Sequence, residues 1–404
     1  MSKLETQPLL ALAAEHLYPN YRQPPFVLER GRGCELWDTE GKRYLDLCAG
    51  VAVSTLGHAH PAFVAAVADQ AARLTHVSNY FFNEPNLRLA GELCRRTGMD
   101  RAFFCNSGSE ANEALLKLAR RHFFARGETA RFRVIAFEEA FHGRTLGALA
   151  MTGRAKYREG FGPFAGGVTH VPYGDEGAVR AAMGDDVAAI IVEPVQGEGG
   201  VFPAPPGFLR ALRAIADERG ALLLIDEVQT GIARTGKLLG HDHDDVRADA
   251  LALAKGLGAG FPIGAMLCRE ALAPALPPGT HGSTYGGNPL ASAVALAVLR
   301  AIDDEGLIEA AAEKGAYLSA ALARVVAARP GVCASERGRG LLRAIALRPG
   351  VDARAVLGRV RDRGVLLTLG GDTALRFSPP LVVTKAELDE GVAVVDAVLA
   401  EIPS

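Results

Sequence analysis

Short apolar segments that end at a charged residue recur through the middle of the chain. The clearest are residues 221–225, which end at Asp226, and residues 251–254, which end at Lys255. Each is too short for an average helix and has no polar face, so the pattern predicts buried, parallel β-strands. Three further segments of this kind lie at residues 102–105, 134–137 and 188–192. Because loops and helical patterns separate these strands, we expect the α/β class, with a doubly wound and mostly parallel sheet.

The two ends of the chain carry other patterns. Residues 1–25 predict a short amphipathic helix that runs into prolines, and so an N-terminal arm. Residues 26–47 have the pattern of a β-meander with glycine-bearing turns. From about residue 306 to residue 404, helical patterns alternate with short strands. We therefore expect a large domain over residues 61–305 and a separate α+β domain over residues 306–404.

Composition narrows the range of partners. The chain has 404 residues, enough for two or three domains, and 49% of them are apolar. Its net charge of −2 provides no field that would gather nucleic acid. The six cysteines form no CxxC pair, which favours a reducing compartment, and no apolar stretch reaches the length of a membrane span or a signal-peptide core. These features predict a cytoplasmic enzyme that acts on small molecules, with no nucleic-acid or membrane partner.

Asp226 and Lys255 are candidates for chemistry. In open parallel sheets the ligand site lies off the carboxyl ends of the strands, so both side chains are expected in one crevice. Pyridoxal 5'-phosphate requires this combination: a lysine for a Schiff base, an acid against its pyridine nitrogen and a helix N-terminus for its phosphate. A buried ion pair between the two residues is the alternative, and the pair alone does not decide between them.

Two loops offer groups for an anion and for a planar ligand. Ser107, Gly108 and Ser109 lie between a predicted strand and a long helical pattern, so their hydroxyls and free amides could hold an oxyanion. Phe141 and Arg144 lie together on the loop after the next strand. An aromatic face can stack on a planar cofactor, and a guanidinium is well shaped for binding a carboxylate.

Charged residues elsewhere are candidates for facing the same crevice. Glu193 and Glu198 lie on a glycine-rich loop beyond a predicted strand, and Arg376 is a charge within a short strand of the C-terminal domain. Residues 282–289 form a polar, glycine-rich loop before a helical pattern. The hydroxyls of this loop could bind a phosphate, or the loop could be a flexible connection.

Two other motifs fail on inspection. Gly231 to Lys237 matches the first part of a P-loop, but Leu238 stands where a serine or threonine must bind magnesium, and the acidic strand precedes the loop. This argues against a nucleotide hydrolase. His58 and His60 are separated by one residue on a loop with no nearby cysteine or carboxylate, so no metal site is predicted.

Taken together, the motifs resemble the class III pyridoxal-phosphate aminotransferases over nearly the full length of the chain. These motifs are, in order, residues 106–112, 141–144, 192–194, 226–231, 255–256 and 282–289. The resemblance implies the fold type I architecture, with a large cofactor-binding domain and a small domain to which residues 26–60 also belong. It further implies a homodimer with shared active sites.

The resemblance implies a role for each candidate residue. Lys255 would carry the cofactor as a Schiff base, and Asp226 would pair with its pyridinium nitrogen, which makes these two the catalytic residues. Further cofactor contacts would come from Ser107, Gly108, Ser109, Phe141, Val228, Gln229 and, from the neighbouring subunit, Thr284.

Substrate roles follow from the same resemblance. Arg144, assisted by Ser283, would hold the distal carboxylate of each substrate. Arg376 would hold the α-carboxylate of glutamate, and Glu198 would neutralise Arg376 when a δ-amino donor is bound. Within the family the chain is most similar to members that move the δ-amino group of N2-acetyl-L-ornithine to 2-oxoglutarate, in arginine biosynthesis.

Val51 bears on the choice of donor. Related ornithine δ-aminotransferases carry a tyrosine near this position, and an aliphatic residue leaves room for an acylated nitrogen. Succinylornithine, N-succinyl-diaminopimelate, ornithine and γ-aminobutyrate remain alternative donors, and an aminomutase is the less favoured reaction.

Overall fold

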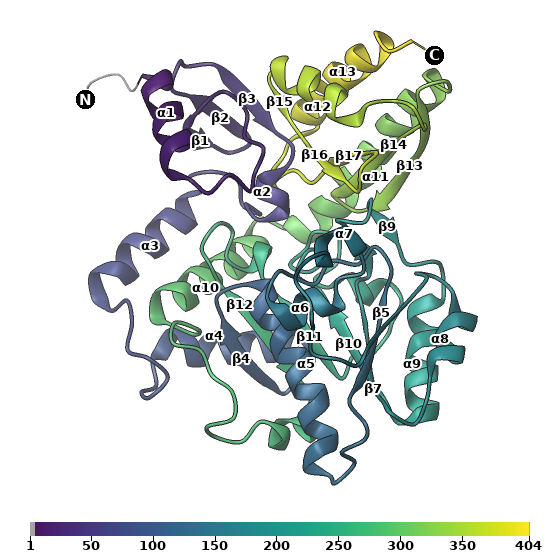
Figure 1. Ribbon diagram of the computed structural model, residues 1–404. Helices are drawn as coiled ribbons and strands as arrows, with labels where there is room; N and C mark the ends of the chain where they lie inside the picture. The colour runs from purple at the N-terminus through teal and green to yellow at the C-terminus, as the bar shows by residue number, and fades with distance from the viewer. Residues whose placement is uncertain (1–4, 404) are drawn as a thin grey trace.

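The computed structural model describes residues 5–403, and a seven-stranded sheet forms its centre (Figure 1). The strand order is β4-β12-β11-β10-β7-β5-β6. These strands are β4 (Arg101–Cys105), β5 (Arg133–Phe137), β6 (Val168–Val171), β7 (Val187–Val192), β10 (Leu222–Asp226), β11 (Ala250–Leu253) and β12 (Gly264–Cys268). Neighbours pair in parallel except β12, which is antiparallel to both β11 and β4. The predicted α/β fold with a mostly parallel sheet is confirmed.

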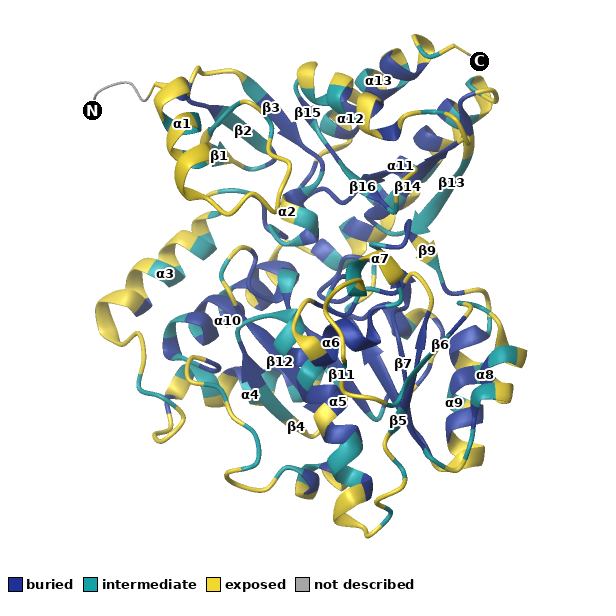
Figure 2. Cartoon of the chain, viewed as in Figure 1, coloured by how far each residue is buried: buried dark blue, intermediate teal, exposed yellow. Residues whose placement is uncertain are grey.

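Alternate residues of the central strands face two different cores. In β10, Leu223 packs with residues of α9 (Phe208–Arg219), whereas Leu224 packs with residues of α5 (Gly108–Ala125). Successive side chains of a strand point to opposite faces, so helices on both faces explain why the strand has no polar side. Figure 2 shows the result as a buried central sheet. Asp226 has the same parity as Leu224, which directs its side chain to the α5 face.

Other helices and short turns surround the large sheet. The α-helices are α3 (Pro61–Arg73), α4 (Glu84–Thr97), α6 (Leu146–Met151), α7 (Ala155–Arg158), α8 (Glu176–Ala182) and α10 (Pro289–Asp304). The 3-10 turns are η1 (Gly240–His243), η2 (Lys255–Leu257) and η3 (Glu270–Ala275), and a small hairpin pairs β8 (Val195–Gln196) with β9 (Phe202–Pro203). α10 packs against α3 and α4.

The first and last parts of the chain share one sheet (Figure 1). That sheet contains β1 (Leu28–Arg32), β2 (Glu35–Asp38), β3 (Arg43–Asp46) and β15 (Val365–Leu366). A second sheet contains β13 (Cys333–Arg339), β14 (Leu342–Leu347), β17 (Ala374–Phe377) and β16 (Thr368–Gly370). The helices here are α1 (Thr6–His16), α2 (Ala49–Ala52), α11 (Leu307–Ala328), α12 (Ala353–Asp362) and α13 (Lys385–Ala400). We propose the division at residues 25, 60 and 305 for the folded chain, because β15 pairs with β3.

The N-terminal arm contains the expected short helix, α1. Residues 1–4 of the arm lie outside the described residues. Among the helices of residues 5–403, none is both long and apolar enough to cross a membrane.

Candidate active site

Asp226 and Lys255 follow neighbouring strands at the same edge of the large sheet. β10 and β11 pair in parallel, with Asp226 opposite Ala252, so both strands deliver their carboxyl ends to one place. Lys255 is the first residue of the turn η2 and is separated from β11 by Ala254 alone. The φ angle of Lys255 is 43°. A positive φ is unfavourable for a residue with a side chain, and such strain concentrates at functional sites. The backbone is thus bent to turn Lys255 toward the crevice.

A cavity of about 410 Å³ lies at this edge and is large enough for a small cofactor. Among the predicted site residues, those that line it are Ser107, Gly108, Ser109, Phe141, Arg144, Glu198, Asp226, Val228, Gln229 and Lys255. Three predicted residues do not line it within the single chain: Ser283, Thr284 and Arg376. Thr284 is exposed, whereas Arg376 lies behind Glu198.

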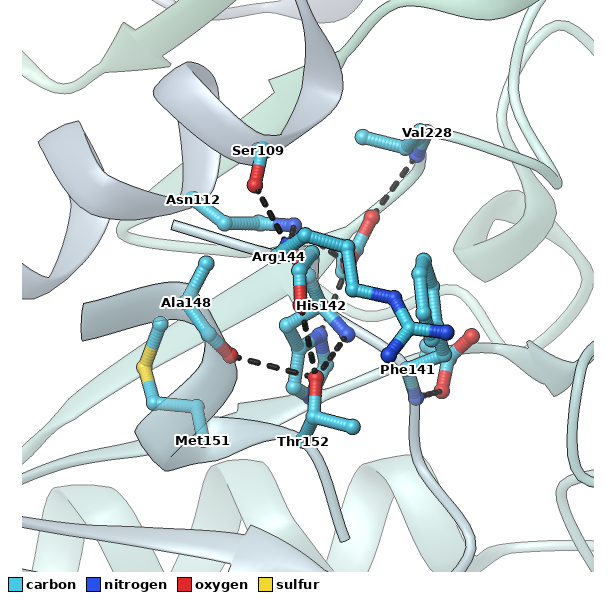
Figure 3. A network of polar contacts seen from close by, with 12 residues as sticks. Ser109, Asn112, Phe141, His142, Arg144, Ala148, Met151, Thr152 and Val228 are labelled. Carbon is cyan, nitrogen blue, oxygen red and sulfur yellow. Dashed lines mark hydrogen bonds and ion pairs between the residues drawn. The ribbon is translucent and has the colours of Figure 1, made fainter. Parts of the chain in front are cut away.

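The Asp226 carboxylate is buried, with 3% of the residue exposed, and is held by three donors. Figure 3 shows the residues that donate, Asn112, His142 and Val228. The side-chain amide of Asn112 and the Nδ1 of His142 each donate to Oδ2 at 2.7 Å. The backbone N–H of Val228 donates to Oδ1 at 2.9 Å. Since a carboxylate only accepts, His142 carries its proton on Nδ1. These bonds hold the Asp226 carboxylate in place at the cavity wall.

Sequence reasoning assigned no role to Asn112 or His142. A signal existed for Asn112, because it lies four residues after Gly108 and therefore on the same face of α5. His142 lies between the predicted residues Phe141 and Arg144, but only the fold shows that its ring turns away from the cavity mouth to Asp226.

The N-terminus of α5 forms one wall of the cavity. Ser107 caps the helix by accepting from the Glu110 N–H at 3.2 Å, which leaves the amides of the first turn directed at the cavity. A Cβ on Gly108 would lie 2.6 Å from the Val228 side chain, so glycine allows these two walls to approach. The Ser109 hydroxyl accepts from the Arg144 N–H at 2.8 Å, which ties the Phe141 loop to this helix. The free amides and hydroxyls together suit a phosphate.

Charge and burial set the ionisation of the groups around Lys255. Burial lowers the pKa of Lys255 below its ordinary value, although the Glu198 carboxylate opposes this. Burial also raises the pKa of Glu193 well above its ordinary value, and the nearby charge of Asp226 adds to the effect. Lys255 is therefore easier to deprotonate than an exposed lysine, and Glu193 is more readily protonated.

Arg376 and Glu198 form an ion pair at the far end of the cavity. The Arg376 guanidinium is 2% exposed and also donates to the Thr368 hydroxyl at 3.0 Å and the Gly197 carbonyl at 3.1 Å. Burial alone would raise the pKa of Glu198, but the charges of Arg376 and Lys255 outweigh it and hold that pKa below its ordinary value. The Gln229 side chain lies beside the pair, 3.4 Å from Glu198 Oε1.

The glycine-rich loop at 282–289 lies outside this cavity. Ser283 Oγ accepts from the backbone N–H of Gly286 at 3.0 Å and from the side chain of Asn106 at 3.4 Å. Thr284 next to it is exposed. Within one chain the loop is therefore ordered near the site and presents Thr284 outward.

The structure changes the position used to argue donor selectivity. Val53, not Val51, contributes to the cavity lining. Both residues lie in or beside α2, where the backbone turns through positive φ angles at Gly50 and Val51. The sequence alone does not predict these positive φ angles, so it does not predict which of the two valine side chains faces the cavity.

Glu227, adjacent to Asp226, does not line the cavity, and its carboxylate bonds to a neighbouring loop instead. Its carboxylate accepts from the backbone N–H groups of Gly240 and His241 at 2.8 and 2.9 Å, from His241 Nδ1 at 2.7 Å and from the Thr230 hydroxyl at 2.5 Å. These bonds close residues 227–241 into a buried loop. No α-helix follows Lys237 directly, so the segment that resembles a P-loop lacks the helix that binds phosphate.

Replacing Glu227 by Gln is expected to lower the free energy of unfolding by about 3 kcal/mol, because His241 loses its buried counter-charge. Thermal unfolding with the visible absorbance of the bound cofactor as a second signal would measure this. Glu270→Gln, which removes an exposed ion pair with Arg101, is the control and should change stability by less than about 1 kcal/mol. Equal losses in the two variants would contradict the role of Glu227.

The loss of unfolding free energy in Glu227→Gln should depend on pH. Burial opposes both charges, but the bond to His241 lowers the pKa of Glu227 and the same bond raises the pKa of His241. The carboxylate's contribution is complete above its ordinary pKa of 4.5 and disappears as pH falls through the lowered value. The imidazolium's contribution is complete below 6.5 and disappears as pH rises through the raised value. The difference from wild type should therefore be largest between pH 4.5 and 6.5.

The residues around the cavity suit pyridoxal phosphate. A lysine with a lowered pKa, a buried carboxylate and a helix N-terminus meet here, and the buried Oε1 of Gln229 has no partner among residues 5–403. An orphaned polar atom at a cavity wall points to a missing ligand. Fold and site together define a pyridoxal-phosphate-dependent transferase.

Comparison with known proteins gives the family. The sequence model of the family "Aminotransferase class-III" matches residues 17–399. The chain belongs to this family, whose members depend on pyridoxal phosphate. Acetylornithine aminotransferase of Myxococcus xanthus is 51% identical, with 96% of each chain covered. Acetylornithine aminotransferase 1 of Bradyrhizobium diazoefficiens is 47% identical, over 97% of this chain and 96% of its own. Among solved structures, the ornithine aminotransferase of Toxoplasma gondii is 36% identical with a TM-score of 0.95, covering 98% and 96% of the two chains.

Proposed function

We propose that the chain moves the δ-amino group of N2-acetyl-L-ornithine to 2-oxoglutarate, giving N-acetylglutamate 5-semialdehyde and L-glutamate in arginine biosynthesis. The observation that carries this proposal is a cavity lined by Lys255, Asp226, Arg144 and Glu198, with Arg376 ion-paired to Glu198 behind the lining. The relatives that cover nearly the whole chain at 42–51% identity are named acetylornithine aminotransferases, which supports this donor.

Lys255 and Asp226 divide the proton transfers between them. When bound, pyridoxal phosphate supplies a conjugated ring that accepts the electron pair left by a departing substrate proton. Asp226, fixed by Asn112 and His142, keeps a proton on the ring nitrogen. Lys255, whose pKa burial lowers, lines the cavity where it would take the proton from the amino-bearing carbon and return it to the cofactor's C4′ atom. The Ser107 to Ser109 turn would hold the phosphate, and Gln229 would hold the phenolic oxygen.

Two arginines allow one site to accept two substrates. Arg144 binds the distal carboxylate of both, because its guanidinium borders the cavity without an ion pair among the described residues. Arg376 binds the α-carboxylate of glutamate after Glu198 moves aside. With N2-acetylornithine, which has no charge at that end, the ion pair stays closed. Ornithine is the second candidate donor, because solved ornithine aminotransferases have TM-scores up to 0.95 with this chain.

The donor can be decided by two measurements on purified enzyme with added cofactor. The visible absorbance of the cofactor should fall when N2-acetylornithine is added and return with 2-oxoglutarate. The value of kcat/KM should be at least about tenfold higher for N2-acetylornithine than for ornithine, N-succinylornithine or γ-aminobutyrate. A larger value for ornithine would replace the proposed donor and keep the aminotransferase.

Glu198→Ala is expected to slow the N2-acetylornithine half-reaction about tenfold and to leave the glutamate half-reaction nearly unchanged. The buried Arg376 then carries an uncompensated charge beside a donor that offers none, whereas glutamate brings its own carboxylate. Rapid mixing of enzyme with each donor separately would measure both half-reactions. A parallel loss in both would show that Glu198 does not switch the site.

We also propose a homodimer whose partner supplies Ser283 and Thr284 to each site. Tyr80 and Phe82 are 92% and 91% exposed on the segment before α4, and Asn79 on the same segment donates to the carbonyls of Ser283 and Gly286. Exposed aromatics grouped in this way are typical of protein interfaces. Light scattering should give twice the chain mass, and Thr284→Ala should weaken cofactor binding. A monomer with full activity would exclude the shared site.

A cytoplasmic location completes the proposal. All six cysteines lie within the described residues and none is paired, which supports a reducing compartment. Cell fractionation would test it.

A further inference from the structure

Arg144 has an unusual environment for a residue that is proposed to bind a carboxylate. Its guanidinium forms no hydrogen bond or ion pair with the described residues, and only its backbone N–H is bonded, to Ser109. Its side chain instead lies over two aromatic rings, 4.1 Å from the centroid of Tyr157 and 5.4 Å from that of Phe141. Figure 3 shows the guanidinium beside the Phe141 ring. A cation with only ring faces for support keeps its N–H groups available for a ligand.

Tyr157 is the nearer of these supports and comes from a different segment. It lies in the short helix α7 and is half-buried, and its ring meets the Phe141 ring edge-on, with centroids 6.0 Å apart. Phe141 is expected to stack on the cofactor. Tyr157 therefore contacts both the residue that would stack on the cofactor, Phe141, and the arginine above it, Arg144. A guanidinium over an aromatic face loses freedom of rotation and stays in one plane.

Ion pairs hold α7 against the C-terminal domain. Arg154, whose side chain is largely buried, pairs with Asp372 at 2.7 Å and with Glu139 at 2.9 Å. Lys156 pairs with the same Asp372 at 2.8 Å. Asp372 lies in the turn between β16 and β17, and β17 is the strand that contains Arg376. The segment that supports Arg144 is thus fastened to the hairpin that contains the second arginine of the site.

We propose that Tyr157 is a positioning residue that sets the substrate's distal-carboxylate subsite by holding the Arg144 guanidinium at the cavity, and that the Asp372 ion pairs hold Tyr157. This inference rests on the role proposed for Arg144. Tyr157 favours substrates with a distal carboxylate through Arg144 and contributes nothing to the proton transfers. Its removal should therefore affect binding of substrates with a distal carboxylate and spare those without one.

The test compares Tyr157→Leu with Tyr157→Phe in the cofactor-loaded enzyme. Two acceptors of equal chain length are used: 2-oxoglutarate, which has the distal carboxylate, and 2-oxopentanoate, which lacks it. Tyr157→Leu should raise the KM for 2-oxoglutarate about tenfold, with little change in kcat, and leave the KM for 2-oxopentanoate unchanged. Tyr157→Phe keeps the ring face and loses only a 3.4 Å contact from Arg154 to the hydroxyl, so it should behave as wild type.

A binding measurement separates positioning from catalysis. Calorimetry with glutarate, an unreactive dicarboxylate, should give a Kd about tenfold higher for Tyr157→Leu than for wild type, and pentanoate should bind both equally. Asp372→Asn, at an exposed position, should raise the glutarate Kd about threefold and serves if the leucine variant does not fold. Unchanged glutarate binding in the folded variants would overturn the inference.

Arg144→Gln distinguishes this inference from the function on which it rests. If Arg144→Gln weakens glutarate binding and Tyr157→Leu does not, the role of Tyr157 is wrong and that of Arg144 stands. If Arg144→Gln leaves glutarate binding unchanged, the distal carboxylate is bound elsewhere and both fail.

Discussion

Lys255→Ala should lower the overall transamination rate by roughly 10⁴-fold or more, the largest effect expected of any substitution in the chain. Lys255 is the one amine at the meeting point of the two strand ends, and burial keeps its pKa below the ordinary value. Without it, no side chain in the cavity lining can both attach the cofactor and move the proton. The steady-state rate with N2-acetylornithine and 2-oxoglutarate measures the loss.

Lys237→Ala is the matched control for this experiment. Lys237 lies in the segment that resembles a P-loop, and its ammonium donates to the carbonyl of Asp242 at the surface. Its removal should leave the rate within about twofold of wild type. A large loss from Lys237→Ala together with a small loss from Lys255→Ala would reverse the assignment and revive the nucleotide-binding alternative.

Asp226→Asn should reduce kcat by about 10²- to 10³-fold while the protein still binds the cofactor. Asparagine keeps the size of the side chain and can still meet Asn112 and His142, but it cannot hold a proton on the ring nitrogen. The measurement pairs kcat with the cofactor content of the dialysed enzyme.

The neighbouring carboxylate provides an internal comparison. Glu227→Gln should lower stability with little change in kcat, since the Glu227 carboxylate bonds to Thr230, Gly240 and His241 within its own loop. Asp226→Asn should do the reverse. If Asp226→Asn loses activity only in proportion to lost cofactor, its role is in binding rather than in turnover.

Local patterns were sufficient for the strand ends and the loops that follow them. Apolar segments ending at Asp226 and Lys255 require burial on both faces, and burial on both faces occurs in parallel sheets covered by helices. Since such sheets place ligands at their carboxyl ends, the pattern alone predicted that both residues face one crevice, and the resemblance to the family then implied the cofactor. The same logic brought Ser107, Ser109 and Phe141 to the cavity lining.

Contacts between distant segments were beyond any local pattern. Nothing near Asn112 or His142 indicates that both bond to a carboxylate more than 80 residues away. Tyr157 of α7 lies under Arg144, and Arg154 at the start of α7 pairs with Asp372, more than 200 residues later. The antiparallel strand β12 between β4 and β11 is likewise a matter of topology.

The sequence by itself therefore determined the fold class, because periodicity and burial act over a few neighbouring residues, and the order of its motifs indicated the family by resemblance. Only the tertiary structure decided which groups hold the Asp226 carboxylate, that Val53 rather than Val51 borders the cavity, and that Glu227 closes a loop beside Asp226. These outcomes depend on where separate segments meet, and that is set by the packing of the whole chain.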